Sequence, residues 1–224
     1  MPLVAPDVER LFTAGTWYDC GRGLSATVTN LPAAELSLPT GQVAACDPFV
    51  GLGDDVEPFV EVVDPGTYPV VLSVVEVARE EDPSFAHERV AAAWLKVSEE
   101  PTVRWSLALT EGQSAESLDD NEFYGYGVDA GTGCFVDAAG TIPLGDLLDE
   151  YGEPLADAMY GEESMNCLPA SMTDDEGRYQ FVAFPSGWGD GSYPTWVGHD
   201  ESGAVTGFVT EFLIVPQPGR ESAA

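Results

Sequence analysis

The residues best suited to chemistry lie in one stretch, Ser186–Trp196, which reads SGWGDGSYPTW. Its three glycines permit a tight turn and a close approach of backbone or ligand, and Pro194 fixes the direction in which the chain leaves. Trp188, Tyr193 and Trp196 have flat apolar rings with polar ends, which suit recognition of a sugar or a peptide. The alternative is that these rings fill the core and anchor the loop. Because loops on a rigid scaffold often carry function, this stretch is the first candidate for a site.

Three carboxylates occupy loops rich in glycine or proline and could share that site. Asp47 precedes Pro48, Asp129 precedes the glycine-rich segment 130–133, and Asp190 lies between two glycines. If they converged, they could bind a hard cation or form the site of a hydrolase. Each is equally explained as a turn-forming residue, and the calcium-loop spacing DxDxDG is missing. The candidate catalytic residues are therefore these three aspartates, and no metal site is predicted.

Nucleophilic catalysis has weaker support. Ser192 is the best-placed hydroxyl, but the sequence lacks the GxSxG order of a nucleophile elbow and does not place His87 or His199 beside it. A Cys134 thiolate would need a neighbouring cation, and the chain has few. Ser192 is kept as a catalytic candidate, and Thr132 lies in a glycine turn too short for a phosphate loop. The predicted ligand-binding residues are Trp188, Asp190, Tyr193, Trp196 and Thr132.

The charge of the chain limits its partners. The 224 residues include 8 Lys and Arg against 39 Asp and Glu, for a formal net charge of −31, while the hydrophobic fraction of 44% is typical of a globular protein. Such a surface repels phosphates, so we predict no nucleic-acid partner and no binding to anionic membranes. Three interpretations remain: solubility or adaptation to high salt, attraction of a basic protein, and cation binding.

The sequence also predicts a compartment. Residues 1–7 show no basic region followed by an apolar run, so no signal peptide is expected. No stretch approaches the roughly 20 apolar residues that a membrane helix needs. Four widely spaced cysteines without a secretion signal indicate reduced thiols and a cytoplasmic location. The chain has two histidines, which do not suggest a zinc site, and no cofactor is predicted.

Hydrophobic periodicity predicts mostly strands. Helices are expected at Asp7–Phe12 and Leu144–Tyr160, the second with a break near Pro154. Tyr68–Ala78 has apolar residues at both its odd and its even positions, which indicates a strand buried on both faces. Phe123–Val128 and Cys134–Ala138 are expected to form a hairpin. The other expected strands are Ala26–Thr29, Gln42–Cys46, Pro58–Val63, Val103–Leu109, Tyr179–Phe184, Thr195–Gly198 and Val205–Val215.

Longer segments carry a family resemblance. They are PTG at 39–41 with ACDP at 45–48, YPV at 68–70, GYGVDAGTG at 125–133 and SGWGDG at 186–191. Together they resemble the bacterial family catalogued as domain of unknown function 4241, over residues 35–215. The resemblance implies a single-domain bacterial protein and assigns no catalytic residue. It also favours a strand at Arg89–Val97, paired with Val103–Leu109, where the residues alone leave helix and strand open.

The sequence thus predicts one α+β domain, residues 1–215, dominated by antiparallel strands, with a tail at 216–224. The segments Gly125–Gly133 and Gly187–Gly191 should adjoin, because close backbone approach at strand ends needs residues without Cβ. The expected function is that of a non-catalytic, acidic binding protein, with an immunity or antitoxin-like role against a basic partner. The alternative is a hydrolase with a carboxylate site at the glycine-rich loops, which acts either with or without a metal ion.

The cysteine prediction can be checked by thiol titration. Protein prepared without reductant, with oxidation blocked and then denatured, should contain four free thiols, because a reducing compartment does not sustain disulfides. Two thiols or none would indicate disulfides and an oxidising compartment.

Overall fold

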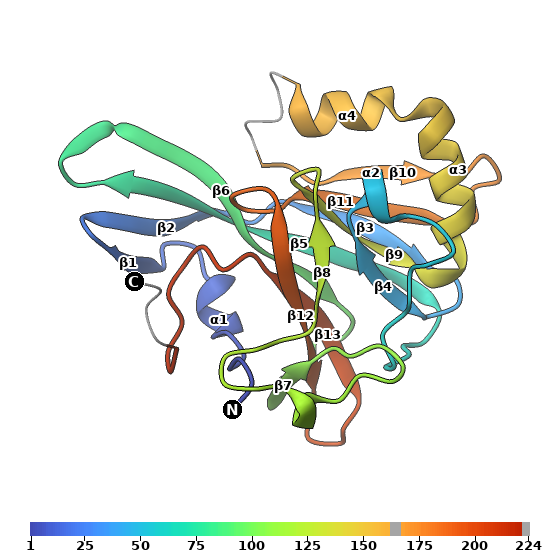
Figure 1. Cartoon of the computed structure of the whole chain (residues 1–224), viewed down its shortest axis with the longest axis horizontal. Helices are drawn as coiled ribbons and strands as arrows, with labels where there is room; N and C mark the ends of the chain where they lie inside the picture. The colour runs from blue at the N-terminus through green and yellow to red at the C-terminus, as the bar shows by residue number, and fades with distance from the viewer. Residues whose placement is uncertain (162–166, 221–224) are drawn as a thin grey trace.

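The computed structural model describes residues 1–161 and 167–220. The chain forms mostly antiparallel β-sheet, 44% of it in strands, with a few short helices. A large sheet curls into a half-barrel, and a smaller second sheet lies beside it (Figure 1). The expected fold class is confirmed.

Nine strands make up the large sheet in the described part of the chain. The path runs β1 (Trp17–Gly21), β2 (Leu24–Asn30), β5 (Gly66–Arg79), β6 (Asp82–Lys96), β13 (Val205–Glu211), β12 (Gly191–His199) and β7 (Arg104–Leu107). Off this path, β3 (Ala33–Leu38) pairs with β5, and β8 (Gly125–Val128) pairs with β12. The β5–β6 hairpin is the longest element and projects beyond the second sheet (Figure 1).

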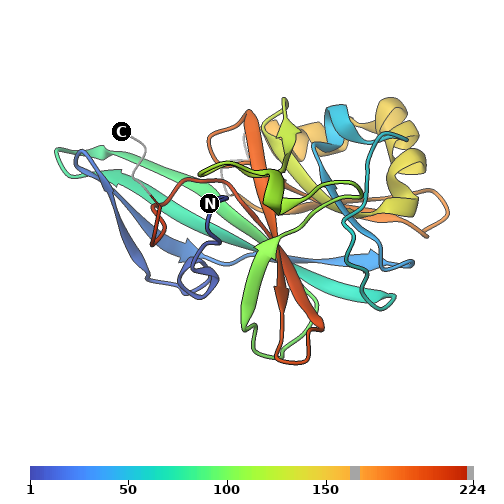
Figure 2. The same ribbon diagram turned by 60° about the horizontal axis from the view of Figure 1, so that its bottom comes forward.

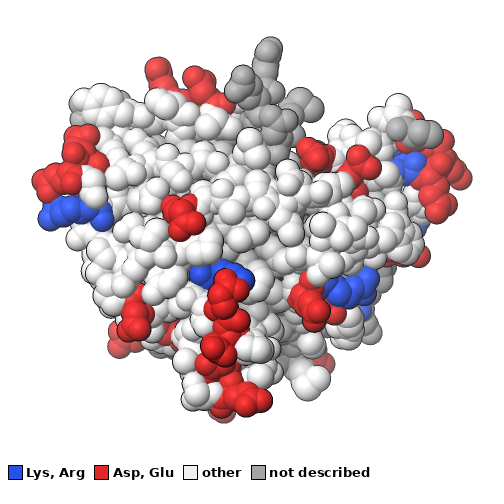
Figure 3. All heavy atoms as spheres, turned by 180° about the vertical axis from the view of Figure 1, so that it is seen from behind, with Lys and Arg blue, Asp and Glu red and all other residues white. Residues whose placement is uncertain are grey.

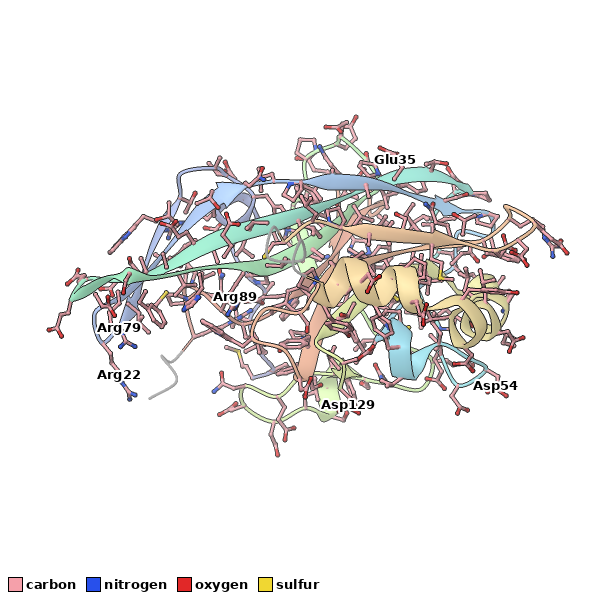
Figure 4. All side chains as sticks on the ribbon, turned by 90° about the horizontal axis from the view of Figure 1, so that it is seen from above. Arg22, Glu35, Asp54, Arg79, Arg89 and Asp129 are labelled. Atoms are coloured by element: carbon pink, nitrogen blue, oxygen red, sulfur yellow. The ribbon has the colours of Figure 1, made fainter. Side chains whose placement is uncertain are left out.

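The second sheet is the middle of three layers. Its order is β10 (Ala170–Thr173), β11 (Gln180–Pro185), β9 (Thr132–Asp137) and β4 (Val43–Cys46). Side chains alternate between its faces, so Phe135 packs in the core shared with the large sheet, whereas Val136 packs in the core beneath the helices. Figures 2 and 4 show the helices on the outer side of this sheet. All six residues of β9 are therefore buried.

Both predicted helical regions are helical, although α3 begins three residues earlier than expected and α2 was not predicted. Asp7 caps α1 (Val8–Leu11), and Asp47 caps α2 (Pro48–Gly51). The expected break separates α3 (Thr141–Tyr151) from α4 (Glu153–Tyr160), with proline in the first turn of α4. Two short 3₁₀ turns, Ala115–Ser117 and Ala138–Gly140, complete the helical residues of the described chain.

Strand positions were predicted better than strand partners. β5 is buried on both faces, with Val74 and Val75 fully buried in different cores, as expected. The pairing of Arg89–Val97 with Val103–Leu109 is wrong, because β6 pairs with β5 and β13 while β7 pairs with β12. Alternation identifies a half-buried strand but does not specify its neighbour.

Two further strand predictions are corrected. Phe123–Val128 and Cys134–Ala138 do not form a hairpin, because β8 pairs with β12 in the large sheet and β9 pairs with β11 and β4 in the small one. The segment between them crosses from one sheet to the other. Pro58–Val63 forms no strand and makes only isolated bridges, at Phe59 and Val62.

Residues 216–220 of the predicted tail contact the N-terminal segment. The Gln217 side chain is buried and its Oε1 accepts a hydrogen bond of 2.9 Å from the Asp7 backbone N–H. Arg220 forms a bidentate ion pair with Glu211, in which Nη1 lies 2.7 Å from Oε1 and Nη2 lies 2.8 Å from Oε2. Its guanidinium also donates to the Val4 carbonyl. Burial raises the pKa of Glu211, and the Arg220 guanidinium opposes that rise. The ion pair therefore offsets part of the desolvation of a buried carboxyl group and joins β13 to both ends of the chain.

Replacing Arg220 with alanine tests this ion pair. Arg220→Ala leaves Glu211, whose side chain is 1% exposed, without its partner, so the free energy of unfolding should fall by about 3 kcal/mol. Arg178→Ala removes an exposed ion pair with Glu176 and should cost at most about 1 kcal/mol. Urea denaturation of both variants measures the difference. Equal losses would contradict a special role for the buried pair.

Candidate functional site

The two glycine-rich segments lie side by side, as predicted. Residues 125–128 of β8 pair with residues 191–194 of β12, and the Ser186 backbone N–H donates to the Gly131 carbonyl at 3.0 Å. A Cβ on Gly125 would come within 2.4 Å of the Tyr193 carbonyl oxygen, so this position cannot hold a side chain without displacing the strand. Figure 1 shows the two strands adjacent at the site.

Asp47 joins the two sheets at this point. It is 1% exposed and follows β4 of the small sheet. Its Oδ1 accepts a 2.9 Å hydrogen bond from the Phe49 backbone N–H, which caps α2. Its Oδ2 accepts from the backbone N–H groups of Asp129 and Ala130, at 3.0 and 2.7 Å. Both oxygens therefore hold backbone, and the residue has the turn-forming role considered for it.

Tyr160, at the end of α4, completes the framework, although the sequence did not single it out. Its hydroxyl donates to the Ala130 carbonyl and lies 3.3 Å from the Thr132 hydroxyl. Burial raises the pKa of Tyr160, and the charges of Asp47 and Asp190 raise it further. Its partners are about thirty residues away along the chain, so no local sequence pattern could reveal this contact.

The three predicted carboxylates do not converge into a metal site. The backbones of Asp47 and Asp129 are adjacent, but the side chains of Asp129 and Asp190 are exposed to solvent. Within residues 1–161 and 167–220, no group of three or more His, Cys, Asp or Glu side chains is arranged to hold a metal ion. Figure 4 shows Asp129 on the same side of the molecule as Asp54, which follows α2.

The aromatic loop divides into an exposed part and a buried part. Trp188 is 56% exposed, and the Arg89 guanidinium lies 4.9 Å from its ring centroid. Tyr193 and Trp196 are buried, and the Tyr193 hydroxyl donates to the Gly189 carbonyl at 2.8 Å. The buried pair has the anchoring role considered above. Trp188, with Asp190 and Ser192, forms the accessible face of the loop.

The strand register separates Ser192 from His199. Ser192 pairs with Gly127, whereas His199 lies seven positions further along β12, about 23 Å away at the usual rise of a strand. His87 lies on β6, opposite Val77. All four cysteines are free, and burial raises the pKa of the Cys134 thiol. His199 is therefore no base for Ser192, and the Cys134 thiol is not activated as a nucleophile needs to be.

A cavity of about 300 Å³ opens next to these loops. Asp47 and β8 form one side of it, and the irregular segment after α2 forms another. Asp55 and Glu57 of that segment line the cavity and are exposed to solvent. The sequence did not indicate either residue, because the segment has no regular structure and no motif.

Comparison with known proteins identifies the family of the chain. The model of the family described as "protein of unknown function (DUF4241)" matches residues 36–210, and the chain belongs to that family. The comparisons with curated proteins and with solved structures find no match. Among the described residues, no helix is long and apolar enough to cross a membrane.

The role of Asp47 can be measured as stability. Asp47→Ala leaves three backbone N–H groups without their acceptor, so unfolding should become easier by about 3 kcal/mol. Asp129→Ala, an exposed neighbour, should change stability by less than about 0.5 kcal/mol. Denaturant unfolding of both variants decides, and an unchanged Asp47→Ala variant would show that the loops are held by other contacts.

Proposed function

We propose that this protein is a non-catalytic binding protein that engages a basic protein partner through the loops at Asp129 and Trp188–Ser192. The proposal rests on the hydrogen bonds that the Asp47 carboxylate accepts. Asp47 is the one buried carboxylate of the three candidates, and both of its oxygens accept hydrogen bonds from backbone N–H groups, which fixes the loops and gives this carboxylate a structural role. Fixed loops with exposed aromatic and acidic groups suit recognition, because little entropy is lost on binding.

The distribution of the cations supports a basic partner. Six of the eight lie over aromatic rings, 4.6–5.8 Å from the centroids: Arg10, Arg79, Arg89, Lys96, Arg178 and Arg220. Side-chain ion pairs in the described chain involve only three of the eight. Figure 3 shows few blue atoms and many red ones on one face. Most carboxylates of the described chain therefore form no ion pair with a Lys or Arg side chain. Their combined electric field would steer a cationic protein toward the surface.

The hydrolase alternative gains no support from the site. Asp129, Asp190 and Ser192 are exposed, and His199 lies seven positions away from Ser192 along β12. We further propose the cytoplasm as the compartment, since four free cysteines suit a reducing environment. An immunity or antitoxin-like role is the specific form of the proposal that best suits the charge.

The partner and its contact can be tested together. A basic protein recovered from the native host at low ionic strength, then purified, should associate at a rate that falls as salt rises through the screening range. Trp188→Ala and Asp190→Ala should each weaken binding at least tenfold, because they remove the exposed aromatic and acidic groups of the loop.

Matched controls lie elsewhere on the surface. Trp17→Ala removes a tryptophan that is 54% exposed on β1, and Glu116→Ala removes an exposed carboxylate, so both should bind normally. Recovery of no basic protein would favour solubility or salt adaptation as the reason for the charge. Unchanged binding by both loop variants would show that the loop is structural.

A further inference from the structure

The cavity beside the loops has walls suited to a cation. Asp55 and Glu57 line it with carboxylates, and Phe59, Tyr124 and Tyr126 line it with aromatic rings. None of its lining residues is Lys or Arg, and neither carboxylate forms an ion pair in the described chain. Aromatic faces and carboxylates both attract cations, and they do so more strongly where water is partly excluded.

A second, independent observation concerns hydrogen bonding. The hydroxyl oxygen of Thr110, a residue of the cavity wall, is buried and makes no hydrogen bond to the described residues, although the residue itself is partly exposed. A buried hydroxyl without a partner costs about 1–3 kcal/mol, so such groups are uncommon unless a ligand or water satisfies them. A ligand rich in donors would pair with the two carboxylates, and a rotation of the Thr110 side chain would bring its hydroxyl within reach of the same ligand.

The size and the donor count favour one chemical class. A volume of about 300 Å³ lies at the lower end of small-molecule sites, which suits a single extended side chain or a ligand of similar size. Guanidinium carries five N–H donors and no acceptor, and its planar face stacks on aromatic rings. Ammonium is more strongly hydrated and lacks the planar face.

We propose that this cavity binds one guanidinium group carried on a short aliphatic chain. The group has two sources: an arginine side chain of the basic partner, or a free alkylguanidine. The first source rests on the function proposed above, and the second does not. The carboxylates of Asp55 and Glu57 pair with the guanidinium, and the hydroxyl of Thr110, once rotated toward the cavity, accepts one of its N–H groups.

The direct test uses small probes and isothermal titration. Nα-acetylarginine amide and ethylguanidinium should each bind saturably at one site, whereas the uncharged isostere Nα-acetylcitrulline amide should not bind. The double variant Asp55→Asn, Glu57→Gln keeps the side-chain shapes and should weaken both probes at least tenfold. Thr110→Val should weaken them about threefold without lowering the thermal midpoint, because the hydroxyl has no partner to lose.

Glu116→Gln is the control, since it neutralises an exposed carboxylate outside the cavity, and it should leave probe binding unchanged. Equal binding of the citrulline and arginine probes would overturn the proposal. So would unsaturable binding, or a double variant that binds as the wild type does.

Competition with the partner separates the two sources. If the group is a partner arginine, ethylguanidinium should displace the basic partner, and the double variant should weaken the complex at least tenfold. If it is a free alkylguanidine, the probe should bind without displacing the partner. Failure of every probe would end this proposal but leave partner binding through Trp188 and Asp190 intact. Loss of the basic partner alone would leave the probe results standing.

Discussion

The Asp47 carboxylate is the contact on which the rest of the site depends. It lies where β4 of the small sheet ends and accepts hydrogen bonds from α2 and from the Asp129–Ala130 backbone, which leads out of the large sheet. The chain also joins the two sheets at this end, through residues 129–131 between β8 and β9 and through residues 186–190 between β11 and β12. Three hydrogen bonds to one anion hold the first of these connections against the start of α2. The loop carrying Trp188 and the wall of the cavity are therefore placed by the same group.

The chain has few cationic side chains, and most of them contact aromatic rings. Six of the eight basic side chains lie over aromatic rings, as Arg89 does over Trp188, and three of those six also form ion pairs with carboxylates. Only Glu211 among the fully buried acids has an arginine partner in the described chain, and there desolvation would otherwise be severe. Most surface carboxylates of the described chain are thus left without a cationic partner.

Local features were predictable and long-range ones were not. β5 was predicted because apolar residues occupy both its odd and its even positions. The break between α3 and α4 was predicted because proline is not tolerated in the interior of a helix. The adjacency of the glycine-rich segments followed from their need for close approach. By contrast, nothing within Phe123–Ala138 shows that β8 and β9 belong to different sheets. The Tyr160 contact and the acidic cavity likewise depend on residues brought together only by the folded chain.

The contacts at both ends of the chain bear on where an autonomous folding unit begins and ends. The family match spans residues 36–210, yet β1 and β2 precede it and β2 pairs along one half of β5. Glu211, Gln217 and Arg220 follow it. A polypeptide cut at the match boundaries would expose the Val75 and Val77 face and leave the edge of β5 open to pairing with other chains. The span over which relatives can be recognised is therefore shorter than the span that must fold together.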